Sequence, residues 1–132
     1  MTNALDIPAI KEASFEASVT SEDKGVRLDL RGSAELQVSD LLGPFLSRVH
    51  QEALRLGVRE VTVDLLKLEF MNSSCFKRLV TWLSALREVE GQQPPYAVRF
   101  LSSSRVRWQK ASLQALSCFA PGSVTVEARD VA

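Results

Sequence analysis

Three polar residues, Asn72, Ser73 and Ser74, stand between an apolar run and an amphipathic helix pattern. The run before them, VTVDLLKLEFM, is rich in β-branched and apolar residues, and its first part predicts a strand. The helix pattern begins at once, so the two hydroxyls fall in the first turn of a helix. Backbone N–H groups are unpaired there, and the helix dipole favours negative charge. The segment is therefore a suitable place to carry a phosphate group.

A simpler interpretation of the same residues is that Asn72 or Ser73 is only a helix N-cap, because Asn and Ser are among the most frequent N-cap residues. Two features favour a larger role. One hydroxyl is enough for a cap, and here there are two in succession. They also follow the end of an apolar strand, where open α/β sheets tend to place their sites.

Other reactive or charged residues lie close by in the sequence. Cys75 follows directly, and helix N-termini lower thiol pKa values, but its position falls on the apolar side of the predicted helix. The basic residues either form a solvated face or bring cations toward the serine turn, where they would contact a phosphate or a partner. These basic residues are Lys77, Arg78, Arg105, Arg107 and Lys110.

Enzymatic chemistry has little support in the residues. The only histidine, His50, lies in a different predicted helix from Cys75, so the cysteine lacks a base and an orienting carboxylate. The chain contains no G-x-S-x-G, G-x-x-x-x-G-K-[ST] or G-x-G-x-x-G motif. One histidine and two distant cysteines, Cys75 and Cys118, give no metal-ligand spacing. We expect a non-enzymatic protein without metal or cofactor.

Composition limits the range of partners. The 132 residues suit one domain, and sixteen basic residues balance sixteen acidic ones. Zero net charge gives no reason to expect nucleic acid or an anionic membrane as a partner. No apolar run approaches the roughly 20 residues of a membrane-spanning helix, and the N-terminus lacks signal-peptide features. We expect a cytoplasmic protein with reduced cysteines.

Hydrophobic periodicity predicts an α/β domain over residues 14–132, preceded by a loose N-terminal segment, residues 1–13, for which docking at the edge of the sheet is an open alternative. The expected strands cover about 15–20, 26–31, 58–66, 96–101 and 124–128. The expected helices cover about 40–56, 73–90 and 105–116. The first two strands should pair as an antiparallel hairpin, and the alternation that follows indicates a mostly parallel sheet of five strands covered by helices.

Two details of this prediction concern the segments before the serine turn. Pro44 suits only the first turn of a helix, which places the start of that helix near Asp40. The apolar residues Val61, Val63 and Leu65 mark one face of the third strand, and Leu66 and Leu68 add apolar bulk on the other. A strand of this kind is expected to be buried on both faces.

The run VDLLKLEFMNSSCFKRL resembles the central motif of STAS domains, the fold of anti-sigma-factor antagonists. In that family, an apolar strand and a turn of the type F-M-D-S-S-G lead into a helix. The order and spacing of elements are similar from about Phe15 to Ala128. Asn72 stands where an aspartate is usual, and Cys75 where a glycine is usual. The chain looks most like a divergent subset with an Asn-Ser/Thr-Ser turn outside sigma-factor control.

The resemblance implies a STAS-like fold and a partner-switching function in a bacterial signalling pathway. By position, Ser73 corresponds to the serine that a partner kinase phosphorylates, and Ser74 is the second choice. Asn72 and Cys75 would then belong to the contact surface, with the basic residues named above. The implied partners are a serine kinase, which is also the anti-sigma-like target, and a phosphatase. A constitutive scaffold domain is the alternative, and the sequence leaves open whether the domain forms a homodimer.

Overall fold

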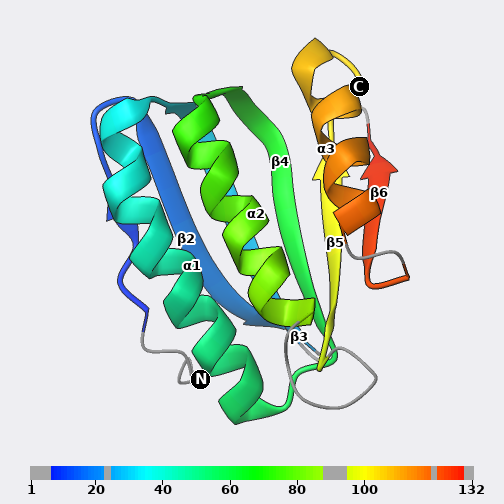
Figure 1. Cartoon of the computed structure of the whole chain (residues 1–132). Coiled ribbons are helices and arrows are strands. Elements are labelled where there is room, and N and C mark those ends of the chain that lie inside the picture. Colours follow the sequence, from blue (N-terminus) through cyan, green and yellow to red (C-terminus); the bar gives the residue numbers. More distant parts are fainter. Residues whose placement is uncertain (1–6, 23–24, 88–94, 120–121, 130–132) are drawn as a thin grey trace.

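The computed structural model describes residues 7–22, 25–87, 95–119 and 122–129. Six strands lie within these ranges: β1 (Ile10–Lys11), β2 (Phe15–Glu22), β3 (Gly25–Ala34), β4 (Glu60–Met71), β5 (Ala97–Ser102) and β6 (Val124–Ala128). Three helices lie there too: α1 (Leu36–Leu56), α2 (Ser73–Arg87) and α3 (Arg107–Phe119). Figure 1 shows them as a two-layer arrangement of helices on a sheet.

The strands form one mixed sheet in which spatial order follows chain order, from β1 to β6. The N-terminal strands β1, β2 and β3 are antiparallel, and β3, β4, β5 and β6 are parallel. The predicted hairpin and the parallel sheet are therefore confirmed. The sheet has one strand more than predicted, because Ile10 and Lys11 pair with β2 within the segment expected to be loose.

All three described helices cover the same face of the sheet, α1 and α2 side by side and α3 over β5 and β6 (Figure 1). The core lies between these layers. It contains the alternate strand residues Val26, Leu28, Val61, Val63 and Phe100, all at most 1% exposed. The helices contribute the apolar stripes that their periodicity predicted, such as Leu79, Leu83 and Leu86 of α2.

The opposite face of the sheet carries polar and charged side chains. Arg27 forms ion pairs with Asp29 and Asp64, and Arg99 forms ion pairs with Glu60 and Glu127. These residues alternate with the core residues of β3, β4, β5 and β6, as the period of a strand requires. The strand now seen as β4 was expected to be buried on both faces, with apolar residues on the second. Thr62 on that face is buried and Asp64 is half-buried, but both are polar, so only the apolar character of the second face was wrong.

Strand β4 contains the main irregularity of the sheet. Its pairing with β3 shifts between Asp29 and Arg31, where β4 accommodates an extra residue, and again between Gly32 and Ser33. The backbone N–H of Leu66 donates to Oδ1 of Asp64 at 2.9 Å. Because of the first shift, Leu68 returns to the core face and is fully buried, contrary to the expectation that it shares the other face with Leu66.

The predicted ends of several elements need correction. Helix α1 begins at Leu36, about one turn before Asp40, because Val38 is buried in the core beside Leu42. Pro44 therefore lies inside the helix and not in its first turn. Strand β4 extends to Met71 because β3 pairs with it that far. The predicted end of α2, residues 88–90, falls outside the described residues.

None of the described helices combines the length and apolar character that crossing a membrane would require.

Candidate functional site

The end of β4 and the start of α2 form the turn that carries the two adjacent serines. Asn72 is the N-cap of α2: its Oδ1 accepts a hydrogen bond from the Ser74 N–H at 2.7 Å, and its carbonyl accepts one from the Phe76 N–H at 2.9 Å. The backbone N–H of Asn72 donates to the Ala34 carbonyl at 2.7 Å, at the end of β3. The turn is thus fixed to the neighbouring strand by hydrogen bonds.

Ser73 occupies the first position of α2 and its side chain is exposed. Within the described ranges, no hydrogen bond involves its hydroxyl. Ser74 is half-buried, and its carbonyl accepts a hydrogen bond from the Ser39 hydroxyl of α1 at 3.4 Å. The capping role and the exposed hydroxyl therefore belong to two different residues, Asn72 and Ser73.

Cys75 is fully buried, and its thiol donates to the Glu35 carbonyl at 3.3 Å. Burial raises the pKa of the Cys75 thiol, and the positive charge of Arg78 offsets this only in part. The structure therefore places Cys75 on the apolar side of α2, as the sequence predicted. Its predicted place in the contact surface was wrong, because the side chain is fully buried in the core. A protonated, buried thiol fits the expectation that it is not a nucleophile.

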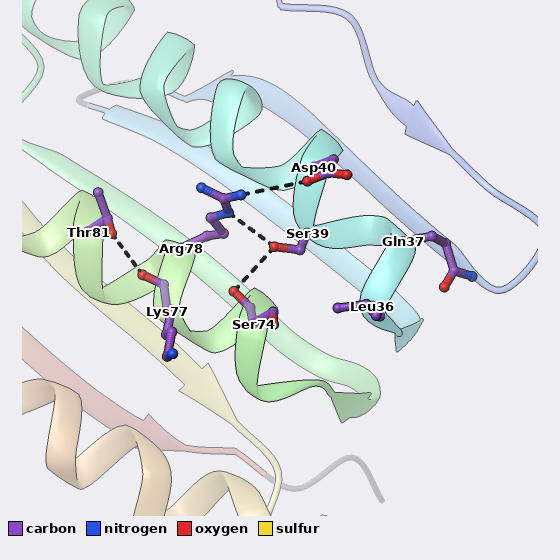
Figure 2. A pocket seen from close by; sticks show the side chains of 8 residues that line it. All are labelled: Leu36, Gln37, Ser39, Asp40, Ser74, Lys77, Arg78 and Thr81. Carbon is purple, nitrogen blue, oxygen red and sulfur yellow. Dashed lines mark hydrogen bonds and ion pairs between the residues drawn. The ribbon is translucent and has the colours of Figure 1, made fainter.

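An open groove of about 810 Å³ lies along the contact between the N-terminal halves of α1 and α2. Figure 2 shows Arg78 reaching from α2 across to α1, where its Nε donates to the Ser39 hydroxyl at 3.1 Å. Its Nη2 lies 3.8 Å from the Asp40 carboxylate, which is itself 91% exposed. Lys77 also lines the groove, but its side chain extends in a different direction. Arg78 thus joins the two helices next to the serine turn.

Arg105 and Arg107 lie in the segment that follows β5 and opens α3, and both are exposed. Neither forms a hydrogen bond or an ion pair with the serine turn within the described residues. Their predicted contact with a phosphate or a partner stays a prediction. Other residues attach α3 to β4, the strand that leads into the serine turn.

That attachment depends on two residues which the sequence analysis did not single out for it. Gln109 is fully buried, and its Nε2 donates to the Leu65 and Leu68 carbonyls, each at 2.8 Å. Its Oε1 accepts from the Ser103 N–H at 2.9 Å. Trp108 Nε1 donates to the Glu69 carbonyl at 2.9 Å. These bonds occupy the edge of β4 beyond Asp64, where the pairing with β5 ends.

Exposed apolar side chains flank the serine turn and were also missed. Leu36 is 64% exposed at the start of α1, and Phe70 is 47% exposed at the end of β4. Phe70 pairs in register with Ser33, so both residues lie near the joined ends of β3 and β4. Both residues lie outside the elements that periodicity predicted, so their being large apolar residues in expected connecting segments was the only available signal. We refer to Leu36, Phe70 and Ser73 as the turn surface.

Among the described residues, no group of three or more His, Cys, Asp or Glu side chains is arranged to hold a metal ion. The chain matches no protein-family model, and no curated protein matches it in sequence.

Two solved structures match the fold over most of the chain. One is a chain of the crystal structure of the diguanylate cyclase SiaD in complex with its activator SiaC from Pseudomonas aeruginosa. It is 18% identical, with a TM-score of 0.68 over 92% of this chain and 99% of that chain. The other is an anti-sigma factor antagonist from Mycobacterium paratuberculosis, 15% identical, with a TM-score of 0.61 over 86% of each chain. The domain is STAS-like in fold.

At this level of identity the likeness concerns the fold. It confirms the STAS-like architecture that the resemblance of the serine-turn motif implied. Whether the chain belongs to the divergent Asn-Ser-Ser subset stays a prediction.

Proposed function

We propose that this STAS-like domain is a non-enzymatic regulatory protein of a bacterial, cytoplasmic partner-switching pathway, in which phosphorylation of Ser73 controls partner binding. The observation that carries the proposal is the division of roles at the start of α2. Asn72 supplies the cap, and the exposed Ser73 hydroxyl is left without a structural bond in the described part of the chain. A kinase could modify Ser73 without removing an interaction on which the fold depends.

The turn surface provides a reason why a partner would bind there. Leu36 at the start of α1 and Phe70 near the end of β4 are exposed apolar residues at the same end of the sheet as Ser73, and exposed apolar area next to polar residues is typical of protein-binding sites. One of the two similar structures contains an activator bound to an enzyme, and the other is an antagonist of an anti-sigma factor, which are both binding functions. The proposed partners are a serine kinase that is also the sequestered target, and a phosphatase.

A phosphate on Ser73 would add about −1.5 to −2 charges at a helix N-terminus. There it is stabilised by about 0.3–1 kcal/mol, so the helix would persist. Lys77 lies one turn further along α2, at the i+4 position, and would favour the same charge. The charge would instead oppose burial of the turn surface in an interface, where an unpaired charge costs several kcal/mol.

The test is a quantitative pull-down from lysate of the native host with four baits: wild type, Ser73→Ala, Ser73→Glu and Gln51→Glu. We expect wild type and Ser73→Ala to recover the same ATP-binding, kinase-like protein, and Ser73→Glu to recover at least about tenfold less, since tenfold corresponds to 1.4 kcal/mol. Gln51→Glu places the same negative charge on an exposed position of α1 and should behave as wild type.

Equal recovery by Ser73→Glu and wild type would contradict the proposal. It would favour the alternative, a constitutive STAS-like interaction domain in which the serine turn is only the start of a helix. Circular dichroism of the four baits checks that each is folded. Mass spectrometry of the chain isolated from its host then determines whether Ser73 or Ser74 carries the phosphate.

A further inference from the structure

A second pocket lies further along the seam between α1 and α2, on the far side of Arg78 from the serine turn. Its volume is about 360 Å³, within the range of about 300–1,000 Å³ that is typical of small-molecule sites. Most of its lining is apolar. The residues that matter for its chemistry are Gly43, Pro44, His50, Arg78, Trp82 and Ala85.

Helix α1 carries its two weakest helix-forming residues where this pocket opens. Gly43 and Pro44 both lie inside α1, where glycine costs about 1 kcal/mol and proline about 3 kcal/mol relative to alanine. A Cβ atom at position 43 would come within 3.3 Å of the Cδ, Nε and Cζ atoms of Arg78. Glycine therefore makes room for the Arg78 side chain along α1. Residues that conflict with their own secondary structure often mark functional sites.

A hydrogen-bonded group of three side chains lies at the other end of the pocket. Trp82 Nε1 donates to the Tyr96 hydroxyl oxygen at 2.8 Å, and this hydroxyl lies 2.7 Å from His50 Nδ1. All three groups are satisfied when Tyr96 donates its own proton to Nδ1, which places the histidine proton on Nε2. The His50 side chain then has one N–H left to offer to a ligand, and the indole nitrogen of Trp82 has none.

Arg78 has donors to spare. Its Nε is bonded to Ser39, but its long contact with the exposed Asp40 carboxylate is of the kind that contributes little in water. A guanidinium group presents five N–H donors in a planar fork that matches a carboxylate. The lining of the pocket therefore combines mostly apolar surface, to which Trp82 contributes, with the cationic side chain of Arg78.

We propose that this pocket binds a small organic carboxylate, with its apolar part against Trp82 and its carboxylate on the guanidinium group of Arg78. The His50 Nε2–H is a second donor for a polar atom of the ligand. Binding would draw Arg78 away from Asp40. The proposal does not depend on phosphorylation of Ser73, so either proposal can fail without the other.

The test uses the ¹⁵N-labelled full chain and a titration with benzoate and hexanoate, each compared with its neutral analogue, benzyl alcohol or hexanol. The two tryptophans give two indole N–H signals in the NMR spectrum. We expect the Trp82 indole signal and the Gly43 amide signal to shift with at least one carboxylate. The Trp108 signal should stay, because Trp108 does not line this pocket and its indole is bonded to the Glu69 carbonyl of β4. The neutral analogues should bind at least about tenfold more weakly, as the loss of a charged hydrogen bond implies.

Arg78→Gln should weaken carboxylate binding by about tenfold or more, and Lys77→Gln, which removes a neighbouring cation on the same helix, should leave it unchanged. Three results would overturn the proposal. They are the absence of any Trp82 shift at about 10 mM of either carboxylate, equal shifts of both indole signals, and equal binding of the acids and their neutral analogues. The last comparison uses the wild-type chain and holds even if Arg78→Gln fails to fold.

Discussion

At the start of α2, two neighbouring residues of similar chemistry have different tasks. Sequence alone did not distinguish them, because Asn and Ser are almost equally good N-cap residues and either could begin the helix. Strand β3 determines which of the two residues is the cap. Its last residue, Ala34, accepts the Asn72 backbone N–H, and this fixes Asn72 as the residue just outside the helix. The position of the serine turn between a strand and a helix was therefore predictable from sequence, but which residue forms the cap was not.

This division of roles makes a prediction about stability. Asn72→Ala removes the bond to the Ser74 N–H and should lower the free energy of unfolding by about 1 kcal/mol. Ser73→Ala removes no bond in the described structure and should change it by less than about 0.5 kcal/mol. Urea unfolding of the two variants gives both values. A loss at Ser73 as large as that at Asn72 would show that Ser73 is the cap.

Among the elements, β4 and α3 departed most from what periodicity predicted. The prediction ended the strand at residue 66 because the apolar alternation breaks there, but β3 pairs with it as far as Met71, and Gln109 donates hydrogen bonds to its Leu65 and Leu68 carbonyls. Gln109 looks like any polar residue in a helix of weak pattern, and its burial depends on a strand edge far away in sequence. Contacts of this kind leave no trace in local periodicity.

Replacement of Gln109 tests this account of the two elements. Gln109→Leu keeps the approximate volume but leaves the Leu65 and Leu68 carbonyls and the Ser103 N–H without their partner. Since an unsatisfied buried polar group costs about 1–3 kcal/mol, we expect a loss of about 3 kcal/mol or more in urea unfolding. The control is Gln114→Leu on the exposed side of α3, which should be nearly neutral. Similar losses for both variants would contradict the role of Gln109.

For the whole molecule, the order of elements was enough to predict the mixed sheet, because short connections and right-handed crossovers leave few alternatives. The number of strands and the polar second face were not predicted. The extra strand β1 is only two residues long, too short for any period to show. The ion pairs of the second face join four strands, so Thr62 and Asp64 could not be assigned to it from one strand alone.

Three parts of the molecule also meet in the group formed by His50 of α1, Trp82 of α2 and Tyr96 before β5. Burial lowers the pKa of His50. Between this lowered pKa and about 6.5, the unfolded chain binds more protons at His50 than the folded chain does. The contribution of His50 to the free energy of unfolding is therefore largest above about pH 6.5 and decreases as the pH falls below it. His50→Asn keeps an acceptor for the Tyr96 hydroxyl but cannot take up a proton.

We therefore expect wild type to lose more of its free energy of unfolding than His50→Asn between about pH 7.5 and pH 5.5. Urea unfolding at both pH values measures the difference. His50 is the only histidine, and the lowered pKa values of Glu52 and Glu127 take effect at more acidic pH. Identical losses in the two proteins would mean that His50 does not titrate differently on folding.

The 12-residue strand β4 extends beyond its pairing with β5. Its pairing with β5 stops at Asp64, and beyond that point it is held by β3 on one side and by Gln109 and Trp108 on the other. A strand that is hydrogen-bonded along both edges moves little at its end. A charge added at this end of the strand would therefore cause little movement in the rest of the sheet. Its effect would remain at the surface that a partner protein contacts.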